Sequence, residues 1–166
     1  MKPKTAGRAS GEIAAETRVQ DSPITNALVA GTSVLTLDGA LPAEYLSPGD
    51  RVITRDSGMA VLRRARVLRR TVRGVGIQAG SLGNMRPDRD AILPASQQVL
   101  IRDWRAQALF GRAQALVPAQ RLIDGEFICD LGVVDLTLVE LVFDAPHILY
   151  ADGLELAACL PQPAGA

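Results

Sequence analysis

The chain has 166 residues and an apolar content of 48%, with a mean hydropathy of +0.14. These values suit one domain that buries its own core, and they exclude wholesale disorder. An aromatic content of 4% excludes recognition built mainly on stacked rings. The formal net charge is zero, from 18 basic and 18 acidic residues.

The zero net charge conceals a split along the chain. Residues 1–121 hold all 18 basic residues and 10 acidic ones, which leaves +8, and residues 122–166 hold the other 8 acidic residues. A strip from Arg51 to Arg73 carries eight arginines against Asp56 alone. The split predicts either a basic surface for a polyanion or two segments that attract each other within one fold. No interleaved aromatics and no recognised nucleic-acid motif accompany the arginines, so we favour the internal match.

Targeting and metal-binding signals are weak. No apolar run approaches the ~20 residues of a membrane helix, and no apolar stretch follows Lys2 and Lys4 as a signal peptide would require. We therefore expect no membrane association and, by default, a cytoplasmic location. Cys129 and Cys159 lack the spacing of a zinc site, so we expect two buried, unbridged thiols, with a disulfide as the alternative in an oxidising compartment. No cofactor is expected, because no cofactor motif is present.

His147 is the one histidine of the chain, which leaves a single candidate for histidine-based acid–base chemistry. Asp144 lies three residues earlier and could orient one of its ring nitrogens. The commoner structural role is a half-exposed histidine at the join of two strands.

We expect a flexible leader over residues 1–23, a domain over residues 24–161 and a tail over residues 162–166. Within the domain, short apolar runs separated by turn signals are typical of an all-β fold. The expected strands cover residues 33–37, 51–55, 98–102, 127–131, 136–143 and 148–150. The segment Ser47-Pro48-Gly49-Asp50 predicts a type II turn, because Gly49 takes the positive φ of the third position without steric cost.

Residues 59–73 are ambiguous. Val61, Ala65, Leu68 and Val72 recur at spacings of four, three and four, which favours an Arg-rich amphipathic helix. The next segment, Gly74-Val75-Gly76, indicates a bend between strands and not a phosphate-binding loop, because no helix pattern follows it.

Five motif blocks occur in a recognisable order. They are Ala27-Leu28-Val29-Ala30-Gly31-Thr32 with Leu46-Ser47-Pro48-Gly49-Asp50; Ile77-Gln78-Ala79-Gly80-Ser81-Leu82-Gly83; Pro94-Ala95-Ser96-Gln97; Leu116-Val117-Pro118-Ala119; and Phe143-Asp144-Ala145-Pro146-His147 with Ala151-Asp152-Gly153. Together, over most of the chain, they resemble the Hint superfamily, the Hedgehog/intein self-processing fold, and its short bacterial members in particular. The resemblance implies a single intertwined β-fold, in which early and late strands are neighbours. It also reverses the helix prediction for residues 59–73 in favour of strands.

The resemblance implies a reaction and its residues. In the family, a thiol at the first residue of the fold attacks the preceding carbonyl, and a histidine of a later block protonates the departing amide nitrogen. The thiol position is Ala27 here, the histidine position is Gln97, and a late histidine position is Pro146. His147 is a displaced candidate one place on, and one step along a strand turns a side chain to the opposite face.

These substitutions imply a pseudoenzyme, a self-processing fold without peptide-bond cleavage that serves as a structural or interaction module for an unidentified protein partner. One alternative is an active autoproteolytic domain that uses Thr25, Thr32 or Cys159 as nucleophile and His147 as base. The other is a polyanion or nucleic-acid binder acting through the strip from Arg51 to Arg73, which the charge argument disfavours.

Overall fold

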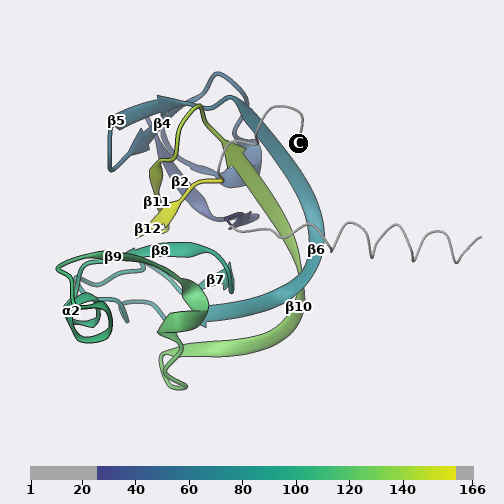
Figure 1. Ribbon diagram of the computed structural model, residues 1–166. Coiled ribbons are helices and arrows are strands. Elements are labelled where there is room, and N and C mark those ends of the chain that lie inside the picture. The colour runs from purple at the N-terminus through teal and green to yellow at the C-terminus, as the bar shows by residue number, and fades with distance from the viewer. Residues whose placement is uncertain (1–25, 160–166) are drawn as a thin grey trace, which may run out of the picture.

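The computed structural model describes residues 26–159, which form a mostly β-stranded fold (Figure 1). The strands are β1 (Leu28–Val29), β2 (Ser33–Thr36), β3 (Gly39–Pro42), β4 (Arg51–Thr54), β5 (Gly58–Val61), β6 (Arg64–Ile77), β7 (Ala91–Pro94), β8 (Gln98–Ile101), β9 (Ala115–Pro118), β10 (Ile128–Val142), β11 (Ile148–Ala151) and β12 (Leu154–Ala157). One α-helix, α2 (Trp104–Phe110), and two 3₁₀ turns, η1 (Ala43–Tyr45) and η2 (Ala119–Leu122), complete it. The expected leader and tail lie outside the described residues.

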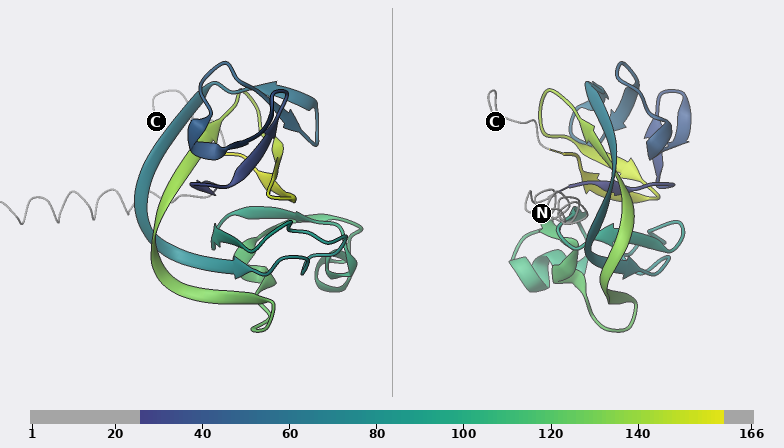
Figure 2. Two further views of the ribbon diagram at one scale, coloured as in Figure 1. Left: turned by 180° about the vertical axis from the view of Figure 1, so that it is seen from behind. Right: turned by 90° about the vertical axis from the view of Figure 1, so that its right-hand side faces the viewer.

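The strands form two antiparallel sheets that interweave early and late parts of the chain. One sheet has the order β1-β10-β6-β7, and the other has the order β3-β2-β4-β11-β12-β8-β9, with β5 paired to β4. Strands β6 and β10 form one long ribbon that curves around the side of the molecule and joins its two lobes (Figures 1 and 2). The expected all-β, intertwined fold is confirmed.

Residues 59–73 form parts of two strands, so the helix prediction from periodicity was wrong and the resemblance was right. All of them except Leu62 and Arg63 fall in β5 or β6, and β6 pairs with β10 along its whole length. A helical spacing of apolar residues is a local signal, and the hydrogen-bonding partner supplied by β10 overrides it.

The segment Gly74-Val75-Gly76 lies inside β6, so the predicted bend between strands was also wrong. A Cβ added at Gly74 would stand 2.9 Å from Cγ2 of Val134, and one added at Gly76 would stand 3.3 Å from Cδ2 of Leu131; both neighbours lie on β10. Gly74 therefore leaves room for Val134 and Gly76 leaves room for Leu131, on either side of a β-bulge between Asp130 and Gly132.

The other predicted strands are present, but two of them are parts of one longer strand. The expected strands 127–131 and 136–143 are parts of the single strand β10, because the chain passes through the bulge without leaving the ladder. Gly49 has a φ of +97°, as the predicted turn requires. The short strands β7, β9 and β12 were not predicted, since a run of four residues is too short to establish a period.

The core is one apolar cluster reaching through both sheets. Its largest fully buried side chains include Phe143, Leu62, Ile77, Leu93 and Leu149, each contributing about 1.5–3 kcal/mol by burial. A smaller cluster consists of Ala27, Leu136 and Leu138. Ala27 is therefore held by packing against β10, just before β1 begins.

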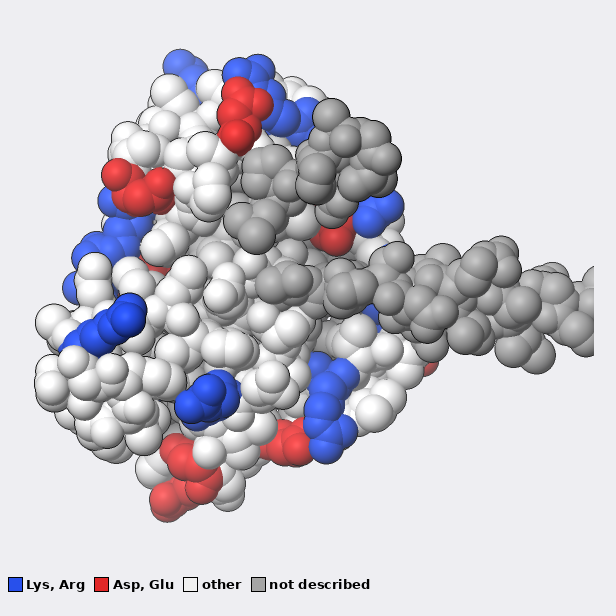
Figure 3. Space-filling view, viewed as in Figure 1, with Lys and Arg blue, Asp and Glu red and all other residues white. Residues whose placement is uncertain are grey.

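The charge split is matched inside the fold. Arg66 on β6 lies opposite Glu140 on β10 and donates hydrogen bonds of 2.7 and 3.0 Å to its carboxylate. Arg63 likewise pairs with Asp144 at 2.9 Å, and Arg73 pairs with Asp130 at 3.2 Å. Basic and acidic side chains both occur across the face drawn in Figure 3. The basic strip and the acidic segment are thus neighbours, as we expected.

Among residues 26–159, no helix is long and apolar enough to cross a membrane. Cys129 and Cys159 form no disulfide, as expected, but both are half-buried and not buried.

Candidate functional site

The fold brings Ala27 and Gln97 into direct contact. The backbone N–H of Ala27 donates a hydrogen bond of 2.9 Å to Oε1 of Gln97. Ala27 is 3% exposed and Gln97 is completely buried. Ala27 is placed by the pairing of β1 with β10, and Gln97 stands immediately before β8. Two positions 70 residues apart, which the resemblance placed in one site, therefore do meet.

The Gln97 side chain has a defined orientation. Its Nε2 donates hydrogen bonds of 2.9 Å to the carbonyl oxygens of Ala157 and Gln98. The backbone carbonyl of Gln97 accepts a hydrogen bond of 2.8 Å from the N–H of Ala119. Because both halves of the carboxamide are engaged, its oxygen rather than its nitrogen faces Ala27.

Asn26 fixes the other side of the peptide bond that precedes Ala27. Its Oδ1 accepts a hydrogen bond of 2.8 Å from the backbone N–H of Gln98. Its Nδ2 donates to Oε1 of Gln98 and to the carbonyl of Ala158, both at 3.3 Å. Asn26 is 2% exposed. The sequence carried no signal for this clamp, since the partners come from β8 and from the residue after β12.

His147 is engaged elsewhere. Its Nδ1 lies 2.7 Å from Oδ2 of Asp56 and 3.4 Å from Oγ of Ser57, in the turn between β4 and β5. Its ring also meets Phe143 edge-on at 5.7 Å. The expectation that Asp144 orients the imidazole was wrong, because Asp144 instead pairs with Arg63.

This histidine does not form a catalytic triad. In a triad, the serine and the aspartate use opposite ring nitrogens, whereas Ser57 and Asp56 both face Nδ1 of His147. Burial raises the pKa of the Asp56 carboxyl, but hydrogen bonds from the N–H of Ile148 and from His147 outweigh it and leave that pKa lowered. Asp56 is therefore an ionised anchor for the ring.

Pro146 and His147 do not join the Ala27–Gln97 pair. Within residues 26–159, the contacts of the His147 side chain are with Asp56, Ser57 and Phe143. Its backbone carbonyl accepts a hydrogen bond of 2.9 Å from the N–H of Ala158. Pro146 is exposed in the loop between β10 and β11.

The other candidate nucleophiles occupy ordinary structural positions. Thr32 lies in the tight turn after β1, where its N–H donates to the carbonyl of Val29 at 3.0 Å. Cys159 follows Ala158, and its backbone forms an isolated parallel β-bridge with Val142. Burial, assisted by the charge of Glu140, raises the pKa of the Cys159 thiol, which disfavours the reactive thiolate. Thr25 lies outside the described residues.

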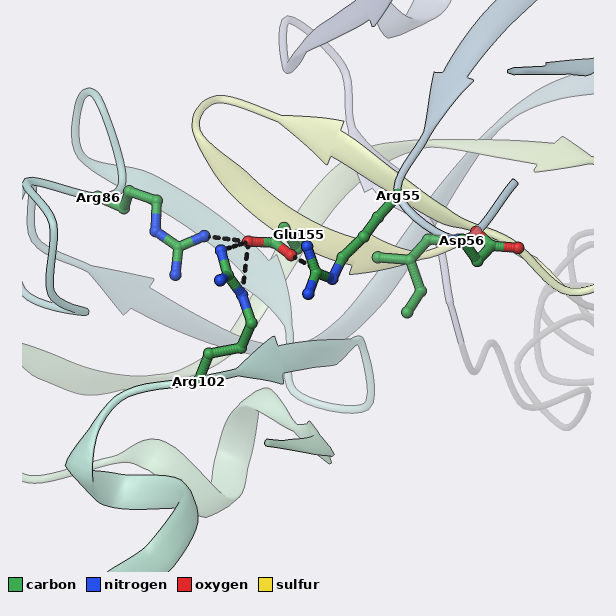
Figure 4. Close-up of polar contacts among 6 residues, drawn as sticks. Arg55, Asp56, Arg86, Arg102 and Glu155 are labelled. Atoms are coloured by element: carbon green, nitrogen blue, oxygen red, sulfur yellow. Dashed lines mark hydrogen bonds and ion pairs between the residues drawn. The ribbon is translucent and has the colours of Figure 1, made fainter. Parts of the chain in front are cut away.

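A second polar centre surrounds Glu155, which is 1% exposed on β12. Arg55, Arg86 and Arg102 converge on its carboxylate from three different parts of the chain (Figure 4). Burial raises the pKa of Glu155, but the hydrogen bonds from Arg102 and Arg86 outweigh it and leave the pKa lowered. We did not predict this centre. Its one signal in the sequence is a carboxylate between Leu154 and Leu156 in an apolar run.

No metal centre accompanies these sites. Over residues 26–159, no group of three or more His, Cys, Asp or Glu side chains is arranged to hold a metal ion.

Comparisons with known proteins bear on the fold and the family. A family model described as "Hint domain" matches residues 26–163. No curated protein matches the chain. Among solved structures, a bacterial intein-like domain from Clostridium thermocellum is 15% identical, with a TM-score of 0.55 over 82% of this chain and 99% of that one.

Two inteins give similar values. A DnaB intein from Synechocystis sp. PCC 6803 is 12% identical, with a TM-score of 0.52 over 80% of this chain and 97% of that one. The MchDnaB-1 intein is 14% identical, with a TM-score of 0.54 over 80% of this chain and all of that one. At such identities the structures establish the fold, and the match of the family model over most of the sequence establishes the family. The chain belongs to the Hint domain family.

Proposed function

We propose that this Hint domain does not cleave the peptide bond between Asn26 and Ala27 and that it serves as a structural or interaction module. The observation that carries the proposal is the hydrogen bond from the N–H of Ala27 to Oε1 of Gln97. It lies where self-cleavage in this family would need a nucleophile and a general acid.

The chemistry of the two side chains supports this. The methyl group of Ala27 has no lone pair with which to attack the carbonyl of Asn26. Cleavage also requires a proton for the departing nitrogen of Ala27, and the group that faces this nitrogen is an acceptor oxygen. The amide hydrogens of Gln97 are already donated to Ala157 and Gln98. A missing general acid alone costs about 10²–10⁴ in rate.

The direct test is intact-mass spectrometry of the purified full chain, incubated with and without a thiol and hydroxylamine. We expect a single species of full mass under every condition. A fragment that begins at Ala27 would contradict the proposal. In that case, matched Cys159→Ala and His147→Ala variants would show whether either side chain takes part in the cleavage.

A reconstruction tests whether the framework still holds the reaction geometry. In the double variant Ala27→Cys/Gln97→His, the thiol and the imidazole would occupy the two contacting positions. We expect thiol- and hydroxylamine-dependent cleavage between residues 26 and 27. The single variant Ala27→Cys is the matched control and should cleave at least about 10²-fold more slowly, since it lacks the general acid. Equal rates in the single and double variants would refute the role assigned to position 97.

A further inference from the structure

The centre around Glu155 is built from separate parts of the fold. Arg55 follows β4, Arg102 follows β8, and Arg86 stands in the loop between β6 and β7 (Figure 4). Oε2 of Glu155 accepts hydrogen bonds from Nη1 of Arg86 and from Nη2 and Nε of Arg102, the last two at 2.5 and 3.2 Å. Nε of Arg55 lies 3.1 Å from Oε1.

The charges of this centre do not balance. Three guanidinium groups face one carboxylate, which leaves a net charge of +2. The carboxylates adjacent in sequence are engaged elsewhere. Asp56 binds His147 and the N–H of Ile148, and Asp103 binds the backbone and side chain of Arg105.

Asp88 does not complete the balance either. Its carboxylate lies against Gly153, where an added Cβ would stand 2.6 Å from Oδ1. Among residues 26–159, Arg55, Arg86 and Arg102 pair with no carboxylate besides Glu155.

The three arginines also keep unused hydrogen-bond donors. A guanidinium group has five N–H donors. The hydrogen bonds to Glu155 use two nitrogens of Arg102 and one of Arg86, whereas Nε of Arg55 makes an ion pair without an aligned hydrogen bond. The buried Nε of Arg86 has no hydrogen-bond partner, and neither has the buried acceptor Oε1 of Glu155. A buried donor without a partner is costly, and so are clustered like charges. The cost of the clustered charges falls when an oxyanion binds to the solvent-facing nitrogens.

Solvent reaches the cluster. The side chains of Arg55, Arg86 and Arg102 are 32%, 17% and 35% exposed, whereas that of Glu155 is 1% exposed. The carboxylate thus lies beneath the arginines and the guanidinium groups stand between it and solvent. This arrangement pre-orients the donors, and pre-orientation reduces the entropy that a ligand must overcome.

We propose that Arg55, Arg86 and Arg102 form a binding site for a phosphate group, with Glu155 beneath them as the anchor that holds the three guanidinium groups together. A phosphate monoester carries a charge of about −2 near neutral pH, which matches the excess of +2. Its oxygens accept the paired N–H donors that guanidinium groups present. The site shares only Arg55 with the strip that runs from Arg51 to Arg73, since Arg86 and Arg102 come from later segments. It does not depend on whether the Asn26–Ala27 bond is cleaved.

The test is isothermal titration of the full chain with inorganic phosphate and with phenyl phosphate, against sodium chloride and benzoate at matched ionic strength. We expect saturable one-to-one binding of a phosphate compound and none of benzoate. Tighter binding of phenyl phosphate than of inorganic phosphate would identify a phosphomonoester as the ligand, and equal binding would identify the free ion. Absence of saturable binding by both phosphates would overturn the proposal.

Arg55→Gln is the informative variant, because Arg55 donates no aligned hydrogen bond to Glu155. We expect it to weaken phosphate binding about tenfold or more, the effect of losing one charge-assisted contact. Arg66→Gln, at an exposed pair with Glu140, is the matched control and should change the affinity less than about twofold. Arg55→Lys, which keeps the charge, should retain part of the affinity if Arg55→Gln folds poorly. Equal weakening by Arg55→Gln and Arg66→Gln would show general electrostatic attraction and would refute a defined site.

Discussion

Replacing Glu155 with glutamine should destabilise this domain far more than an ordinary loss of one surface charge. The variant keeps the shape of the side chain but removes the charge on which Arg55, Arg86 and Arg102 converge. It also places an amide donor against guanidinium donors, so that at least one contact becomes repulsive.

The magnitude follows from burial. Removing one partner of a buried ion pair costs about 3–5 kcal/mol, because it leaves the opposite charge uncompensated. Glu155 is 1% exposed, but its arginine partners are 17–35% exposed and regain some hydration. We therefore expect the low end of the range, about 3 kcal/mol. For a chain of this length, that corresponds to a fall in Tm of roughly 6–12 °C.

The assay is urea unfolding followed by far-ultraviolet circular dichroism near neutral pH. Glu140→Gln is the matched control, because Glu140 pairs with Arg66, which is 61% exposed. It should cost about 1 kcal/mol or less. Equal losses of unfolding free energy in Glu155→Gln and Glu140→Gln would refute the reasoning.

The same variant makes a prediction about pH. The pKa of Glu155 is lowered from 4.5 in the folded protein, so its stabilisation is fully present above pH 4.5 and is lost as the pH falls through the folded value. The difference in unfolding free energy between wild type and Glu155→Gln should narrow below pH 4.5. A difference that stays constant down to the acid transition would contradict the ion-pair explanation.

Two further predictions concern the turns near this centre. Gly153→Ala should cost about 2 kcal/mol or more of unfolding free energy, because φ is +81° and the new Cβ would stand 2.6 Å from the Asp88 carboxylate. The control Gly39→Ala, with φ +105° and nothing within 4 Å, should cost only about 1 kcal/mol. Equal losses of Tm in the two variants would refute the clash. Asp56→Asn should cost on the order of 1 kcal/mol near neutral pH, discounted for the exposure of Asp56. Because the Asp56 pKa is lowered from 3.8, the loss of stability in Asp56→Asn should disappear in acid below pH 3.8. NMR of the His147 ring should report its release from Asp56. A loss of stability that persists in acid would exclude this contact as the cause.

The family and the central pair could be predicted from sequence, because they depend on short segments with local meaning. The turn at Gly49 requires a positive φ that glycine adopts at no steric cost, so the motif is legible without its surroundings. The order of such motifs identified the fold and matched Ala27 with Gln97. The structure then placed these two residues in contact at 2.9 Å.

Sequence motifs did not predict the contacts between elements that are distant in the chain. The periodicity of residues 59–73 favours a helix, and only the presence of β10 as a partner makes the segment a strand. His147 sits three residues from Asp144, but the chain direction after β10 turns its ring to Asp56 instead.

The amino-acid sequence by itself determined which family of folds the chain adopts and which of its positions face each other at the Ala27–Gln97 pair. The tertiary structure alone decided how the charges are used, because a charge is balanced by whatever lies within a few ångström of it and not by its neighbours in sequence. The overall balance of 18 basic and 18 acidic residues is met locally along β6 and β10. At Glu155 it is not met, because three arginines there face one carboxylate.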